Sequence, residues 1–232
     1  LEVTMGRGNG EARYAGRSMD GSQFKRESLG MRVEKSNIGE VLDKLEAQVY
    51  YNYANHVMDN VTLRSPGSGG MGGHGGHGGM SMGGHGGHMM SSGMTMQLDR
   101  RTVGGRVMGT WQWQDVKLES GLDTQTNTHR SMSRGSWEKD AQFNSYGAFS
   151  ELTWSTSEQD KLIGGARLDR TLVENFRSGS DGERSDTLPS GFMRLEHTLA
   201  DLPLMLYAGV GYTERFPDYW ELFSPKLGPN GS

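Results

Sequence analysis

The chain has 232 residues, of which 33% are hydrophobic and 36 are glycine, and its mean hydropathy is −0.67, so it carries fewer core-forming residues than an ordinary soluble domain buries. Its formal net charge of −4 gives no reason to expect nucleic acid, and the absence of cysteine excludes disulfides, zinc fingers and thiolate catalysis within this sequence. No segment approaches the ~20 apolar residues of a membrane helix, but a membrane β-strand needs only about 9–11 residues with one apolar face. The first residues, Leu1 to Met5, contain neither a basic nor an apolar segment, so no signal peptide is expected.

Hydrophobic and polar residues alternate along much of the chain, and a period of two residues predicts β-strands. Several predicted strands run for about 15 residues, well above the globular mode of about 5–6. This length suits a tilted strand that crosses a bilayer and extends beyond it. In chain order, the predicted strands cover residues 1–5, 22–36, 41–57, 94–112, 115–128, 141–156, 160–175, 188–200 and 203–215.

The connections between these strands alternate between short turns and long polar segments, and the long segments cover residues 6–21, 58–93, 129–140 and 176–187. Outer-membrane barrels alternate in this way because their periplasmic turns are short and their extracellular loops are long. A soluble all-β protein with irregular loops is the alternative, and it has no reason to alternate. Nine strands cannot close a bacterial barrel, which takes an even number. We therefore predict an all-β fold, an incomplete arc of an antiparallel, up-and-down transmembrane β-barrel over residues 1–232.

The segment from Asp43 to Tyr53 has the clearest alternation, with apolar residues at the odd positions from Leu45 onwards and polar residues at most even positions. His56 and Met58 follow with the polar parity. If no bulge intervenes, their imidazole and thioether groups point to the same polar side. Such a pair can supply two ligands to a soft metal ion at the mouth of a polar cavity. We predict His56 and Met58 as metal ligands; the alternative is a rim histidine and a packed methionine without a ligand role.

Residues 66–93 form a predicted extracellular loop rich in Gly, His and Met, in which GGHGGH occurs at 72–77 and again at 83–88. A segment this rich in glycine buries too little apolar surface to fold by itself. Thioethers select Cu(I) and imidazole suits Cu, Zn and Ni, so this mixture favours copper, with Cu(I) preferred over Cu(II). The alternative is a low-complexity loop in which His and Met are incidental. The accessory metal ligands predicted here are His74, His77, Met80, Met82, His85, His88, Met89 and Met90.

Other features of the chain carry no predicted chemistry. His129 and Met132 are expected to be solvated loop residues. The sequence has no nucleophile elbow, no phosphate-binding loop and no paired carboxylates, so we predict that the protein is not an enzyme.

Three stretches of the chain resemble a known family. The run Arg215–Phe223, RFPDYWELF, is similar to the barrel motif of TonB-dependent outer-membrane receptors, and together with residues 6–14 and 55–59 it resembles their copper-receptor branch. The resemblance implies a barrel of about 22 strands that is plugged by an N-terminal domain and energised through a TonB box. For the copper branch it implies that a His-x-Met pair, matched here by His56 and Met58, joins Cys and Met ligands from the plug. This sequence departs from the pattern in having no plug, TonB box, cysteine or closing strands.

These features predict a central fragment of a TonB-dependent copper receptor of the bacterial outer membrane, which binds copper at the cell surface and imports it. The expected partners are the copper ion, outer-membrane lipid and, through parts outside this sequence, the plug domain and the TonB complex; no nucleic-acid partner is expected. One alternative is a receptor for a siderophore or another metal chelate, which would bind its ligand through aromatic and Arg loop residues. The other is a surface protein that sequesters metal without transport.

Overall fold

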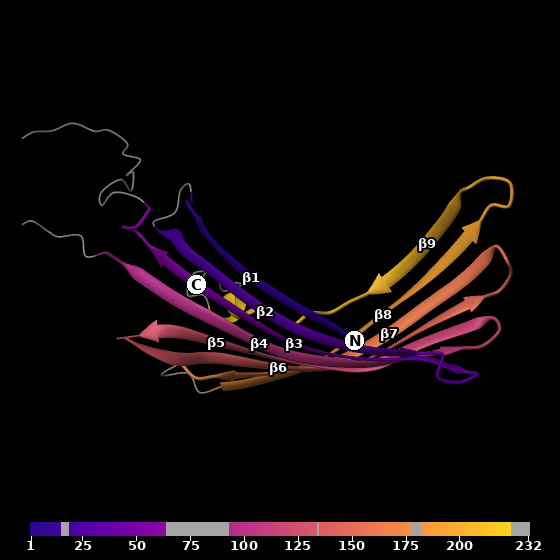
Figure 1. Ribbon diagram of the computed structural model, residues 1–232, viewed down its shortest axis with the longest axis horizontal. Helices are drawn as coiled ribbons and strands as arrows, with labels where there is room; N and C mark the ends of the chain where they lie inside the picture. Colours follow the sequence, from indigo (N-terminus) through magenta and orange to yellow (C-terminus); the bar gives the residue numbers. More distant parts are fainter. Residues whose placement is uncertain (15–18, 64–92, 134, 178–181, 224–232) are drawn as a thin grey trace, which may run out of the picture.

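The chain folds into one curved antiparallel sheet (Figure 1). The computed structural model describes residues 1–14, 19–63, 93–133, 135–177 and 182–223. Each strand pairs with the next along the chain, which confirms the predicted up-and-down arc. The elements are β1 (Glu2–Ala12), β2 (Asp20–Ser36), β3 (Leu42–Asp59), β4 (Thr95–Gln112), β5 (Val116–Ser133), β6 (Ser136–Ser155), β7 (Asp160–Asn175), β8 (Gly182–Thr198), β9 (Met205–Tyr212) and a short helix, α1 (Tyr219–Phe223). No helix among the described residues is both long and apolar enough to cross a membrane.

The two faces of the sheet differ in chemistry, because successive side chains of a strand point to opposite sides. On the concave face, Arg167 on β7 donates hydrogen bonds to Asp123 Oδ2 at 2.7 Å and to Asp169 Oδ2 at 2.7 Å. The convex face instead exposes apolar side chains. They include Val49, Val103, Val107, Leu122 and Leu168, each more than half exposed. An apolar outside and a polar inside are what a barrel in a lipid bilayer requires.

The strands extend farther than predicted towards one end of the sheet, which is the end where the connections after β1, β3, β5 and β7 lie. We call it the long-connection end. The predicted long loop over residues 129–140 is wrong, because β5 and β6 stay paired from Thr128↔Gln142 up to Ser133↔Ser136. The strict alternation of connection lengths is therefore wrong as well. Beyond the bilayer a strand needs no apolar face, so the polarity of these residues does not end the pairing.

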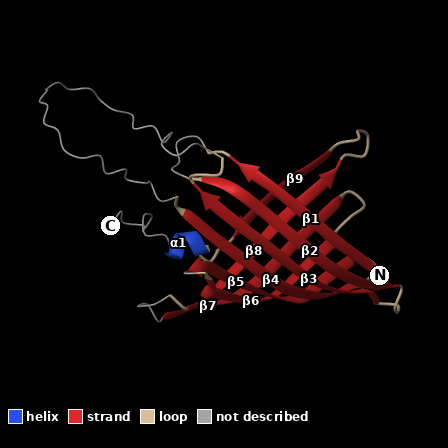
Figure 2. Ribbon diagram, turned by 60° about the vertical axis from the view of Figure 1, so that its left-hand side comes forward, coloured by secondary structure: helices blue, strands red, loops and turns tan. Residues whose placement is uncertain are grey.

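A small hydrophobic core lies on the concave side at the long-connection end, where the chain folds back after β9 (Figure 2). Tyr219 of α1 is only 2% exposed and packs with Ala141, Phe143 and Val173 of β6 and β7. Phe216, in the segment before α1, packs against the same cluster. These contacts hold α1 against the inner wall of the arc, at the edge of a cavity.

Candidate metal-binding site

A cavity of about 850 Å³ opens on the concave face at the long-connection end. Each of the elements around it contributes at least one side chain: Phe24 from β2, His56 from β3, Arg100 from β4, His129 from β5 and Tyr219 from α1. Residues that are about 200 positions apart in the sequence therefore meet at one cavity. His56, predicted as a ligand from its parity, its place near the strand end and the family resemblance, is part of its wall.

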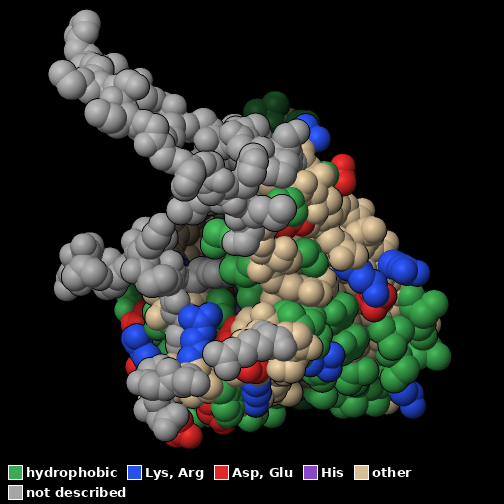
Figure 3. All heavy atoms as spheres, turned by 90° about the vertical axis from the view of Figure 1, so that its left-hand side faces the viewer, with side chains coloured by type: hydrophobic (Ala, Val, Ile, Leu, Met, Phe, Trp, Pro, Cys, Tyr) green, Lys and Arg blue, Asp and Glu red, His purple; other side chains and the backbone are tan. Residues whose placement is uncertain are grey.

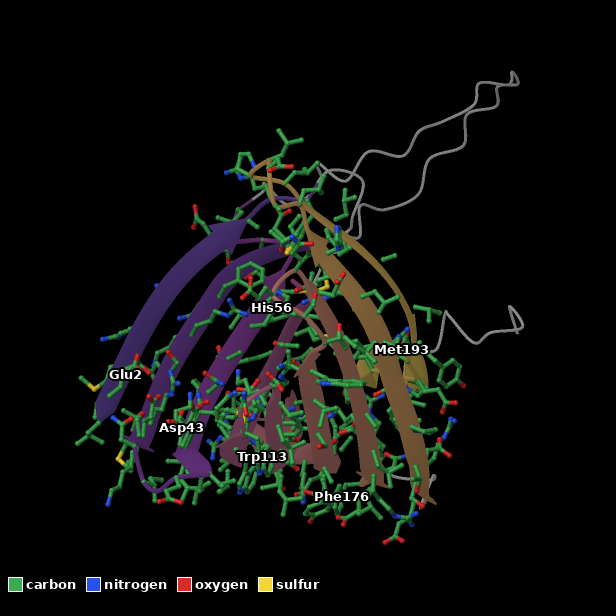
Figure 4. The ribbon with its side chains drawn as sticks, turned by 90° about the vertical axis from the view of Figure 1, so that its right-hand side faces the viewer. Glu2, Asp43, His56, Trp113, Phe176 and Met193 are labelled. Atoms are coloured by element: carbon green, nitrogen blue, oxygen red, sulfur yellow. The ribbon has the colours of Figure 1, made fainter. Side chains whose placement is uncertain are left out.

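The His56 imidazole has one nitrogen that is shielded from solvent. Its ring stacks on Phe24, with 4.2 Å between the ring centroids and 27° between the planes, because the two residues pair across β2 and β3. Figure 4 shows His56 on β3, at the opposite end of the strand from Asp43. The His56 Nε2 atom is buried and has no hydrogen-bond partner among the described residues. A buried polar atom without a partner carries a desolvation cost that a bound ligand removes. This nitrogen is therefore well suited to coordinate a metal ion.

Met58 lies on the same face of β3 as His56. The pairing of β3 with β4 is regular from Lys44↔Thr110 to Asp59↔Thr95, so no bulge interrupts the parity between the two predicted ligands. The one irregularity nearby lies on the neighbouring strand, between Gly21 and Gln23 of β2. Met58 stands farther out than His56 and is not among the residues that line the cavity. The pair therefore spans from the cavity wall to its outer rim.

Met96 is a third soft donor that the sequence did not single out. It is the direct partner of Met58 across β3 and β4, and directly opposed residues of an antiparallel pair have Cβ atoms about 4.5–5.5 Å apart on the same face. It follows the Gly/His/Met loop of residues 66–93, at the start of the strand predicted over residues 94–112. Only the strand register reveals that it faces Met58.

The structure corrects the interpretation of His129, which is not a solvated loop residue. It lies on β5, and its ring stacks on Tyr219 with 4.3 Å between the centroids and 1° between the planes. Phe143 contacts it edge-on, at a centroid distance of 5.5 Å. The sequence could not show this, because the contact depends on α1 folding back onto β5 from 90 residues away.

Polar contacts at its two ends anchor α1. The Tyr219 hydroxyl donates to Asp140 Oδ2 at 3.0 Å, and it also accepts a hydrogen bond from Arg177. Burial, followed by the Asp140 carboxylate, raises the pKa of Tyr219 to about 12. In the segment before α1, the Arg215 guanidinium forms a two-pronged ion pair with Glu221, at 2.7 and 2.6 Å. The Arg215–Phe223 motif is thus a small folded unit with its own internal ion pair.

The ion pair within this unit predicts a pH dependence. The Arg215 guanidinium, followed by the Asp218 N–H, lowers the pKa of Glu221 from 4.5 to about 2. A carboxyl group whose pKa is lowered by folding stabilises the folded form above its unfolded pKa, and this contribution is lost as the pH falls towards the folded pKa. Hydrogen exchange at the α1 amides, corrected for the intrinsic rate, should therefore accelerate between pH 4.5 and about 2. The Glu221→Gln variant should lack this acceleration; an equal acceleration in the variant would assign it to another group.

The predicted accessory ligands, from His74 to Met90, fall outside the described residues. Within the part of the chain that the structure describes, no group of three or more His, Asp or Glu side chains converges to hold a metal ion.

Comparisons with known proteins agree with this architecture. The family described as "TonB dependent receptor-like, beta-barrel" matches residues 3–232. The chain belongs to the TonB-dependent receptors. They are transporters of the bacterial outer membrane and not enzymes, which confirms the predicted family, location and absence of an enzymatic role.

A solved structure named "Copper transporter OprC" is 52% identical to the chain and superimposes with a TM-score of 0.83. The match covers 99% of this chain and 35% of the OprC chain, so the sequence spans about a third of the length of that transporter. No match was found among curated proteins. The long-connection end of the sheet corresponds to the extracellular end of a receptor of this family.

Proposed function

We propose that the chain is the barrel segment of an outer-membrane receptor that binds copper at the cell surface and imports it in a TonB-dependent way. The observation that supports this proposal most directly is the 52% identity to a copper transporter over nearly the whole chain. The soft donors at the extracellular end are consistent with it, because His56 offers a buried, unpartnered nitrogen and Met58 a thioether on the same face. Thioether ligands favour Cu(I) over harder divalent ions.

In this function His56 and Met58 supply the barrel half of the copper site, and the plug domain supplies the other half. The stacking on Phe24 fixes the orientation of the imidazole, so its Nε2 atom is in place before the metal arrives. The opposed Met96 is positioned to pass copper to Met58 from the outer rim. Release into the periplasm then requires the plug to move, with energy from the TonB complex. The part of the chain described here provides coordination and catalyses no covalent step.

Metal selectivity of the purified full-length receptor tests the proposal. The receptor is dialysed against copper with ascorbate, copper without ascorbate, zinc or nickel, and the retained metal is measured by mass spectrometry. We expect copper to be retained at least about tenfold more tightly than zinc or nickel, and more tightly with ascorbate, because a thioether prefers Cu(I). Retention of a ferric chelate but of none of these free ions would favour the metal-chelate receptor instead.

A further inference from the structure

β2 carries one extra residue beside the predicted metal ligands. Its pairing with β3 shifts between Gly21 and Gln23, so Ser22 has no partner in the ladder and Gly21 lies opposite Met58. This is a β-bulge, which changes the direction in which the side chains of a strand point. A ladder that continued without the bulge would place Ser22 opposite Met58. The bulge therefore brings a glycine into the row that contains Met58.

A glycine is required at this position because the ring of Phe24 lies over it. A Cβ atom on Gly21 would collide with the Cε2 and Cζ atoms of Phe24. The same ring stacks on the imidazole of His56, with 4.2 Å between the centroids. A glycine inside a strand often marks such a close approach. Gly21 thus leaves the space in which the Phe24 ring can lie against His56.

The immediate neighbours of His56 in its row are apolar. Phe24 and Leu98 lie directly opposite it on the two adjacent strands, and all three residues line the cavity. The Nε2 atom of His56 is buried among them. Charged side chains are common elsewhere at this end of the molecule, where Figure 3 shows Lys, Arg, Asp and Glu next to hydrophobic residues. The apolar surroundings of the imidazole are therefore a local feature of this row.

We propose that Gly21 and Phe24 determine metal specificity, because they make the His56 site prefer Cu(I) to divalent ions; this inference rests on the proposed function. The hydrophobic residues around a metal site control the access of water and the local dielectric constant. A divalent ion loses more hydration energy than a monovalent ion in such surroundings, because the Born cost of desolvation grows with the square of the charge. Phe24 thus adds to the selectivity of the imidazole and thioether donors, and Gly21 acts through Phe24.

The test measures the affinities of the purified full-length receptor for Cu(I), kept reduced with ascorbate, and for Zn(II), each in competition with a chelator of known affinity. The wild type is compared with Gly21→Ala, with Phe24→Ala and with the double variant that carries both substitutions. Gly165→Ala is the matched control. A Cβ atom on Gly165 would collide with the ring of Phe192, but these residues lie on β7 and β8 and do not line the cavity. The heat-induced shift on denaturing gels verifies that each variant forms a barrel.

We expect the ratio of Cu(I) affinity to Zn(II) affinity to fall at least about tenfold in Gly21→Ala and in Phe24→Ala, and to keep its wild-type value in Gly165→Ala. The double variant should match Phe24→Ala, because a Cβ atom at position 21 displaces nothing once the ring is gone.

An unchanged ratio in both single variants would overturn the inference, while copper binding by the wild type would still support the proposed function. Additive losses in the double variant would overturn it too, because Gly21 would then act independently of Phe24. A wild-type receptor that retains no copper would refute the proposed function itself, and this inference with it.

Discussion

Cells that carry the full-length receptor with His56→Ala/Met58→Ala are expected to lose copper uptake, whereas deletion of residues 71–93 is expected only to slow uptake when copper is scarce. The double substitution removes the buried imidazole nitrogen and the thioether that share one face of β3. Without them copper loses the imidazole and one of the two opposed thioethers on this part of the barrel wall, and uptake at limiting copper should fall at least about tenfold. The deletion leaves the strand ends intact and removes only accessory donors. The measurement is accumulation of copper in cells over minutes, by mass spectrometry, at low and at saturating copper.

A second double variant, His197→Ala/Met193→Ala, provides the matched control. It also removes one histidine and one methionine, but from the part of β8 farthest from the long-connection end, where His197 pairs with Asp160 at 2.7 Å. It should leave uptake unchanged. If copper uptake is indifferent to both double variants and to the deletion, the copper assignment fails and a metal-chelate receptor takes its place. If the deletion alone abolishes uptake, the loop is the main site and the strand pair is accessory.

The parity of β3 shows why part of this site could be predicted from sequence. A strand with one face against lipid must alternate, and the alternation from Leu45 to Tyr53 places every later residue of the strand on a known side. His56 and Met58 follow without a bulge, so their common face was fixed by counting residues. The number of strands was predictable from the same alternation. Their order was predictable because each strand of an up-and-down barrel pairs with its neighbour in the chain.

What the sequence could not show is how remote segments meet. The stacking of His129 on Tyr219 joins β5 to a helix that follows β9, and no local pattern encodes such a contact. Met96 faces Met58 only because β3 and β4 pair in one register across a long connection. The polar residues 129–140 resemble a loop in the sequence because they lack the apolar face of a strand within the bilayer. Outside the bilayer the pairing continues on backbone hydrogen bonds without one.

The Arg215–Phe223 motif lies between these two cases. Its residues resemble a family motif, so its identity was visible in the sequence, but its position on the concave face was not. The structure indicates what the motif does, because Arg215 and Glu221 close it internally while Tyr219 fixes it to Asp140 on β6. These contacts fix α1 against the inner wall at the edge of the cavity.

Replacing Tyr219 with alanine is therefore expected to detach α1 from the inner wall without unfolding the barrel. Its ring is 2% exposed, stacks on His129 and belongs to the cluster with Phe143 and Val173. Truncating a buried aromatic side chain costs about 3–5 kcal/mol, but the cost here falls on the docking of α1 and not on the strand ladder. Cleavage by trypsin after Arg215 in the full-length receptor should accelerate about 100-fold or more, since proteolysis follows the population of the opened form. The heat-induced shift of the barrel on denaturing gels should stay unchanged.

The Tyr219→Phe variant separates packing from hydrogen bonding at this position. It keeps the ring on His129 and loses the hydroxyl that donates to Asp140 at 3.0 Å. A hydrogen bond to a charged group contributes about 1.5–3 kcal/mol, so cleavage should accelerate roughly 10- to 100-fold, less than in the alanine variant. If both variants are cleaved as slowly as the wild type, α1 is held by contacts other than Tyr219. If the phenylalanine variant is cleaved as fast as the alanine variant, the hydrogen bond to the buried Asp140 carboxylate governs the docking of α1. The stacking of the ring on His129 then contributes little to it.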